Sequence, residues 1–140
     1  LWPPSRNRAV WFYNPDIFPQ LATMNMAVGT GGIPVYMPAG GVSGTPYASL
    51  MGRPAIPTEH CQTLGTTGDI ILGDWAEYLI GGKSGGGVQV ASSIHLKFDY
   101  DETTFRFVTR YDGQPWWAAP LTPKHGSNTL SPFVALATRA

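Results

Sequence analysis

The sequence predicts an α+β fold that is rich in β-structure and contains one short helix. Short runs of β-branched and aromatic residues recur along the chain, separated by clusters of turn residues. Glycine (17 residues) and proline (13 residues) together exceed a fifth of the 140 positions, whereas one stretch alone carries a signal for the start of a helix. This composition favours strands joined by loops over long helices.

The N-terminal part predicts a buried strand followed by a short helix. Residues 9–13 (AVWFY) are aromatic and β-branched, as in a buried strand. Residues 14–16 (NPD) then provide an N-cap side chain, a proline suited to the first helical position and a carboxylate that the helix dipole favours. Pro19 cannot donate a backbone hydrogen bond, so we expect about two helical turns that end near Met24.

Two further extended segments are predicted in the middle of the chain. Residues 33–37 (IPVYM) begin with an early proline that suits an edge strand, and glycine-rich loops flank them at 29–32 and 39–46. Residues 50–57 form the second segment, because a residue that precedes a proline is disfavoured in a helix.

The clearest alternation of apolar and polar residues lies at residues 103–111 (TTFRFVTRY). The aromatic residues fall on one face and Arg106, Val108 and Arg110 on the other, which predicts a strand with one solvated side. A tight turn at 99–102 would join this strand to an extended segment at 93–98. The pair Asp112-Gly113 is a further turn signal, which leads to Trp116 and Trp117. Residues 131–138 predict an apolar closing strand.

Two Gly-Asp pairs, Gly68-Asp69 and Gly73-Asp74, flank the apolar residues of a predicted strand at 69–72. In an extended strand the two carboxylates would lie about 16 Å apart on opposite faces. A glycosidase pair requires about 5 to 9.5 Å. We therefore expect structural turns in which each glycine adopts a positive φ or a tight-turn conformation, and each aspartate accepts a hydrogen bond from a backbone N–H. The Asp74 turn would set the geometry between this strand and the next, at 78–80.

No motif for catalysis, cofactor binding or metal binding is complete. Residues 82–84 (GKS) resemble the end of a phosphate-binding loop, but Glu77 replaces its first glycine and more glycines follow instead of a helix, so we expect a flexible or partner-ordered loop. Residues 99–110 lack the glycine and glutamate of a calcium loop. The three histidines and Cys61 lack zinc-type spacing, and residues 41–45 break the nucleophile-elbow pattern. We expect no enzymatic activity, no cofactor and no metal.

The charge pattern limits the classes of partner. Nine basic and nine acidic residues cancel without forming a basic cluster, which predicts no specific nucleic-acid site. No apolar run approaches the roughly 20 residues of a membrane span, and a single cysteine excludes an internal disulfide. The first residues (LWPP) include no initiator methionine and resemble no signal peptide, so we expect a fragment or processed product of a longer protein.

Five segments taken in order carry a resemblance to a known family. They are residues 8–24 (RAVWFYNPDIFPQLATM), 32–36 (GIPVY), 50–54 (LMGRP), 68–80 and 105–113 (FRFVTRYDG). In this order they resemble the C-terminal portion of a tailed-bacteriophage or prophage major capsid protein with the Hong Kong 97-type fold. The resemblance covers roughly residues 6–138.

The resemblance implies a structural subunit of an icosahedral capsid that self-assembles into hexameric and pentameric capsomers. On the family pattern, residues 1–92 would be the main part of an axial domain near the capsomer centre, residues 93–119 strands of a peripheral domain, and residues 120–140 a return to the axial domain. The N-terminal arm, projecting loop and long helix of the family have no counterpart here. The implied partners are other copies of the chain, with a scaffold, a maturation protease and a portal as further candidates. The implied location is the virion capsid, after synthesis in the bacterial host cytoplasm.

Four residues are candidate subunit contacts. Arg106 and Arg110, on the solvated face of the predicted strand, are expected to meet acidic groups of the missing segment or of a neighbour. Trp116 and Trp117 are expected to pack or to contact another subunit.

The alternative to a capsid subunit is a β-rich virion-surface or carbohydrate-binding module that uses Trp116, Trp117 and Tyr111. A hydrolase has the least support, because its candidates, Asp74, Glu77 and His95, could meet only through folding.

Overall fold

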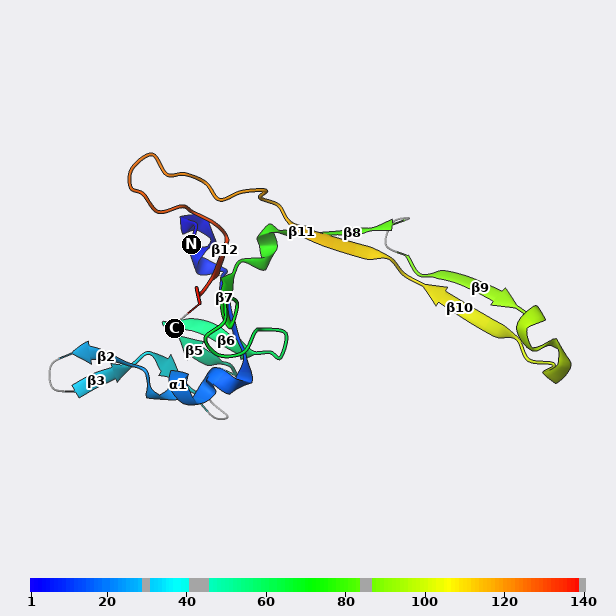
Figure 1. The fold of residues 1–140 in the computed structure, drawn as a ribbon, viewed down its shortest axis with the longest axis horizontal. Coiled ribbons are helices and arrows are strands. Elements are labelled where there is room, and N and C mark those ends of the chain that lie inside the picture. The colour runs from blue at the N-terminus through cyan, green and yellow to red at the C-terminus, as the bar shows by residue number, and fades with distance from the viewer. Residues whose placement is uncertain (29–30, 41–45, 84–86, 139–140) are drawn as a thin grey trace. The chain divides into compact units, whose positions relative to one another are not determined.

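The chain divides into two units in a computed structural model that describes residues 1–28, 31–40, 46–83 and 87–138. The first unit comprises Leu1–Ala76 and Ala119–Ala140, and the second comprises Glu77–Ala118 (Figure 1). Among the described residues, the strand at 78–82 pairs with the strand at 111–115 of its own unit and with no strand of the first unit.

A six-stranded sheet forms the centre of the first unit, in the order β12-β7-β1-β6-β5-β4. Its strands are β1 (Val10–Tyr13), β4 (Tyr36–Met37), β5 (Ala48–Leu50), β6 (Arg53–Pro57), β7 (Ile70–Gly73) and β12 (Phe133–Ala135). Strand β1 runs parallel to β6 and antiparallel to β7, and the remaining neighbours are antiparallel.

The helical signal after β1 produces two short helices. The 3₁₀ helix η2 (Pro15–Ile17) leads into α1 (Phe18–Thr23), and η1 (Pro3–Asn7) precedes β1. As the sequence predicts, the Asn14 side chain caps η2, because its Oδ1 accepts a hydrogen bond from the Asp16 N–H at 3.0 Å.

The hydrophobic core of the first unit lies between these helices and the sheet. Its buried members are Tyr13, Ile17, Leu21, Tyr36, Leu50, Ala55 and Ile70. The hydroxyls of Tyr13 and Tyr36 lie 3.3 Å apart, so the two phenols form a hydrogen bond inside this apolar region. Burial, followed by the interaction with Tyr36, raises the pKa of Tyr13. The Tyr13 phenol is therefore a neutral member of the core.

Three predicted segments in the first unit differ from the structure. Residues 50–57 form a hairpin of β5 and β6 instead of one extended segment, because Met51 and Gly52 both have positive φ (51° and 73°) and reverse the chain. The strand predicted at 33–37 is divided between β3 (Gly31–Pro34) and β4, and β3 pairs with β2 (Asn25–Val28), which the sequence analysis missed. Of the loops expected at 29–32 and 39–46, residues 29–30 and 41–45 lie outside the described residues, whereas Gly31 and Gly32 belong to strand β3 and not to a loop. The closing strand β12 is shorter than residues 131–138.

The second unit is a ribbon of two antiparallel strand pairs (Figure 1). Strand β8 (Tyr78–Gly82) pairs with β11 (Tyr111–Pro115), and β9 (Gln89–Ser93) pairs with β10 (Thr104–Val108). Between the pairs, the Lys83 N–H donates to the Arg110 carbonyl at 3.1 Å. The 3₁₀ segment η5 (His95–Tyr100) connects β9 to β10, and η3 (Trp75–Glu77) precedes β8.

The ribbon corrects three expectations. Residues 93–98 are not a strand, since β9 ends at Ser93 and η5 follows. The strand predicted at 103–111 ends at Val108, and a second one starts at Tyr111. Asp112 and Gly113 are not a turn: they lie inside β11, where they pair with Gly81 and Ile80. The Asp-Gly signal is overridden because β8 is available as a pairing partner for these residues.

Candidate assembly surface

The second unit has no core of its own. Among its described residues, none from Glu77 to Ala118 is buried. Twelve large apolar or aromatic side chains are exposed there instead: Leu79, Ile80, Val88, Val90, Ile94, Leu96, Phe98, Tyr100, Phe105, Phe107, Tyr111 and Trp116. A two-stranded ribbon is at best marginally stable in water without a surface to pack against. These side chains therefore form an apolar surface of the kind that marks a protein contact.

The strand register places part of this surface on one face of β9–β10. Phe105 pairs with Ser92 and Phe107 with Val90, so these four side chains share a face. Phe105, Phe107 and Val90 are 61%, 68% and 61% exposed. We call these three side chains the phenylalanine face. The expected alternation is correct for this strand, but the prediction of a single solvated side is wrong, because the apolar face is exposed as well.

The connection between β9 and β10 extends the apolar surface. In and beside η5, Ile94, Leu96, Phe98 and Tyr100 are each more than half exposed. The segment η5 ends at Asp101, which has a left-handed φ of 54°. An ion pair of 2.9 Å joins Lys97 to Glu102, with both side chains largely in solvent, so it contributes little to stability. The apolar side chains therefore dominate this end of the ribbon.

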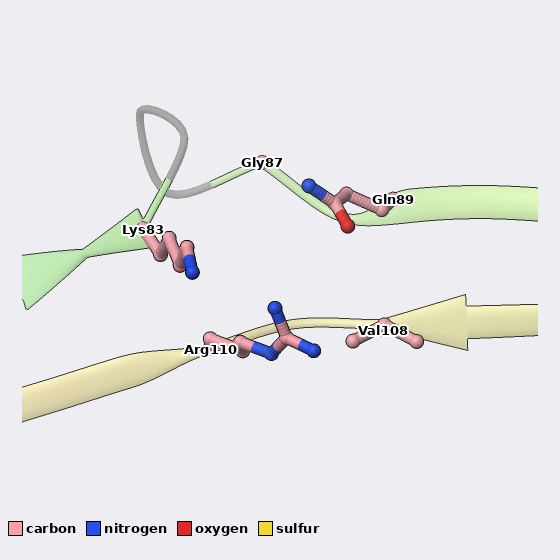
Figure 2. A pocket seen from close by; sticks show the side chains of 5 residues that line it. All are labelled: Lys83, Gly87, Gln89, Val108 and Arg110. Atoms are coloured by element: carbon pink, nitrogen blue, oxygen red, sulfur yellow. The ribbon is translucent and has the colours of Figure 1, made fainter.

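The basic candidates lie on the ribbon away from the phenylalanine face. Arg106 pairs with Ala91, on the face opposite Phe105 and Phe107, and its side chain is exposed. Figure 2 shows Lys83 and Arg110 on opposite strands where the two strand pairs meet, lining a small hollow with Gly87, Gln89 and Val108. The Lys83 and Arg110 side chains are exposed, so two positive charges are available to an acidic group at this point. Residues 84–86, part of the expected partner-ordered loop, lie outside the described residues.

The two tryptophans near the end of β11 differ in exposure. Trp116 is 67% exposed. Its backbone N–H donates a hydrogen bond to the Glu77 carbonyl at 2.9 Å, which extends the β8–β11 pairing. Trp117 is half-buried.

Gly113 lies against the Tyr78 ring, because a Cβ at this position would come within 2.6 Å of Tyr78 Cε1. Glycine at 113 thus makes room for a cross-strand aromatic ring and does not form the predicted turn.

The two Gly-Asp pairs lie at opposite ends of β7 in the first unit. Gly68 has a φ of 92°, and Asp69 Oδ2 accepts a hydrogen bond from the Gly65 N–H at 2.9 Å. Gly73 differs from the prediction: it is not a turn residue but the last residue of β7, paired with Val10 and Phe133. A Cβ at Gly73 would lie 3.0 Å from Phe133 Cδ1, so close packing explains this glycine.

Asp74 forms an ion pair that the sequence analysis missed. Its Oδ2 accepts hydrogen bonds from Arg8 Nη2 (2.9 Å) and Nε (3.1 Å), and its Oδ1 accepts one from the Ala76 N–H (3.2 Å). The Asp74 side chain is 1% exposed, whereas that of Arg8 is 53% exposed. Burial opposes ionisation of Asp74, but the Arg8 guanidinium, together with the Ser5 side chain and the Ala76 N–H, outweighs it and lowers the pKa of this carboxyl below its usual value. Asp74 is therefore a charged structural anchor at the end of β7.

No group of three or more His, Cys, Asp and Glu residues that could hold a metal occurs among the described residues. Cys61 is buried, and its burial, followed by the nearby Asp69 charge, raises the pKa of its thiol. A thiol with a raised pKa is a poor nucleophile at neutral pH. In the part of the chain that the structure describes, no helix is both long and apolar enough to span a bilayer.

Comparison with known proteins gives one match. A sequence model of the phage capsid family matches residues 1–123. The chain belongs to the phage capsid family. No curated protein and no solved structure matches it. The family is structural and not enzymatic, which agrees with the exposed ribbon and with the structural use of Asp74.

Proposed function

We propose that this chain is the C-terminal portion of a phage or prophage major capsid protein with the Hong Kong 97-type fold. The first unit would serve as the axial domain and the ribbon as part of the peripheral domain, with the boundary at Ala76. Copies would assemble into hexameric and pentameric capsomers of an icosahedral virion shell, after synthesis in the bacterial host. Scaffold, maturation protease and portal are the further partners that such a shell would need.

The observation that supports this proposal most is that none of the described residues of the ribbon is buried. Ordering a polypeptide costs roughly 1 to 2 kcal/mol per residue in backbone entropy, and a ribbon without a core has little apolar burial to offset it. Moving Phe105, Phe107 and their exposed neighbours out of water would contribute roughly 1 kcal/mol or more each. Contact with other copies of the capsid protein supplies that burial, and closed rings of identical subunits join two different patches of each copy.

In this proposal the basic side chains and the tryptophans of the ribbon also contact a neighbouring subunit. Arg106 and Arg110 would meet acidic groups of a neighbouring subunit or of the remainder of the capsid protein. Such charge pairs increase the rate and specificity of association more than they increase affinity. Trp116 and Trp117 would pack against the same neighbour. The carbohydrate-binding alternative is not favoured, because the family match gives it no support.

The experiment that tests the proposal removes the phenylalanine face. In the complete capsid protein, Phe105→Ser with Phe107→Ser should reduce particle yield, measured by electron microscopy and sedimentation, by about tenfold or more, since several kcal/mol of burial are lost. Leu64→Ser, which removes an exposed apolar side chain of the first unit outside the ribbon, is the control and should assemble normally. Normal particles from the double variant would contradict the proposed role of the ribbon.

A further inference from the structure

The ribbon contains the one Asp-Gly bond of the sequence. Asp112 is the only aspartate that a glycine follows, and no asparagine precedes a glycine. The main-chain nitrogen of the next residue can attack an aspartate carboxyl, and glycine hinders this attack least because it has no Cβ and restricts the backbone least. The Asp112 side chain is exposed. This bond is therefore where the sequence obstructs the attack least.

The hydrogen-bond pattern of β11 leaves the attacking nitrogen free of the ladder. The Arg110 carbonyl and the Trp116 N–H both form backbone hydrogen bonds across the β8–β11 pairing. In an antiparallel pair, residues that exchange hydrogen bonds alternate with residues that do not. Gly113 is an odd number of residues from both, so its pairing with Ile80 is of the kind without hydrogen bonds. The Gly113 N–H consequently points away from β8.

This N–H instead contacts the carboxyl that it would attack. The Gly113 N–H donates a hydrogen bond to Asp112 Oδ1 at 2.9 Å. The residue opposite Asp112 is Gly81, so no side chain stands across from the carboxyl in the pair. Closing a ring between the two groups also requires the backbone to turn out of the extended conformation. A two-stranded ribbon without a core opens readily, which permits this movement.

We infer that Asp112 is a site of spontaneous modification, at which the folded chain converts aspartate into isoaspartate. In the first step Gly113 N forms a bond to Asp112 Cγ, and one carboxyl oxygen leaves as water with the N–H proton and a proton from solvent. The product is a cyclic imide. Water then adds to the main-chain carbonyl carbon of Asp112, and the bond from that carbon to Gly113 N breaks. The inference is independent of the proposed function, since it concerns a single chain.

The modification alters the main chain of β11 and leaves the net charge unchanged. The chain then runs through Cγ, which adds one carbon atom between Asp112 and Gly113, and the original main-chain carbonyl becomes the free carboxylate. Residues after Asp112 can no longer keep their register with β8. The contact of Gly113 with the Tyr78 ring and the hydrogen bond from Trp116 to Glu77 both depend on that register. Modification should therefore release the β8–β11 pairing beyond Asp112.

Peptide mapping of the purified chain tests the inference. Trypsin cleaves after Arg110 and Lys124, and the peptide 111–124 contains Asp112 as its only aspartate. After incubation of the folded chain near neutral pH, chromatography and fragmentation should reveal a second form of this peptide with unchanged mass. Its rate of formation should exceed that at every other aspartate by about tenfold or more. A smaller difference would overturn the inference.

A comparison with the unfolded chain tests whether the ribbon permits the reaction. The rate at Asp112 in the folded chain should lie within about tenfold of the rate in urea, because the ribbon opens readily. Greater protection would overturn the inference, since the strand would then hold the bond out of reach of the attack.

Two variants identify the reaction. Asp112→Glu should reduce isomer formation by about tenfold or more, because its ring would need one more atom, and its melting temperature should match that of the wild type, since position 112 is exposed. Asp112→Asn forms the same ring with loss of ammonia, so its peptide should gain mass on incubation; this variant provides the test if Asp112→Glu does not fold. An unchanged isomerisation rate in Asp112→Glu, or no mass gain in Asp112→Asn, would overturn the inference.

Discussion

Replacing Arg8 by methionine should destabilise the first unit, because the Asp74 carboxylate would keep its burial and lose its cation. Arg8 donates two hydrogen bonds to Asp74 Oδ2, and Asp74 is 1% exposed. Breaking a buried ion pair from one side costs about 3 to 5 kcal/mol. Arg8 is half exposed, so solvent screening reduces the cost to about 2 kcal/mol. Asp74→Asn should cost less, about 1 kcal/mol, since the arginine left behind can be hydrated.

The pH dependence of this effect gives the more specific test. The pKa of Asp74 is lowered in the folded state, so its contribution to stability is present above the unfolded value of about 3.9 and is lost as pH falls through the folded value. In Arg8→Met the main cause of lowering is gone, and burial then favours the protonated carboxyl. The stability gap between wild type and variant should therefore narrow as pH falls from 7 toward 4.

Urea unfolding followed by circular dichroism at pH 7 and pH 4 measures both quantities. The expected result is a gap of about 2 kcal/mol at pH 7 that shrinks at pH 4. A gap that stays below about 0.5 kcal/mol at pH 7 would refute the argument, because a change of that size is typical of a surface substitution. A large gap that is independent of pH would refute the electrostatic explanation.

Two further predictions concern a strand end and the basic side chains of the ribbon. Gly73→Val should lower the melting temperature by about 3 to 10 °C, because a side chain at Gly73 is forced against Phe133 at a cost of about 1 to 3 kcal/mol. The control is Gly81→Val, because a Cβ at Gly81 would meet nothing closer than 3.9 Å. An unchanged melting temperature for Gly73→Val would contradict the packing argument. Arg106→Glu with Arg110→Glu should prevent particle formation by the complete capsid protein, as judged by electron microscopy, whereas Lys124→Glu should not. Normal particles from the Arg106/Arg110 variant would exclude the proposed acidic contacts.

The sequence predicts local structure well where the signal comes from neighbouring residues. The strand at β1, the Asn14 cap and the short helix before Met24 all depend on residues within a few positions of one another, and the structure has them. The family was also identified from the order of short segments, and the family match agrees with it.

The remaining features depend on residues far apart in the chain. Arg8 and Asp74 are separated by 66 positions, and no spacing rule connects them. Gly73 and Gly113 look like turn residues, but each is required by a ring that the fold brings next to it, Phe133 in one case and Tyr78 in the other. The hairpin β2–β3 was missed because its glycines resemble a loop.

A cryo-electron microscopy reconstruction of particles formed by the complete capsid protein tests the central claim most directly. The account predicts an icosahedral shell in which Phe105 and Phe107, more than 60% exposed in the single chain, are covered by a neighbouring subunit. A shell in which both rings remain in solvent, or a protein that stays monomeric under conditions where its family assembles, would contradict it.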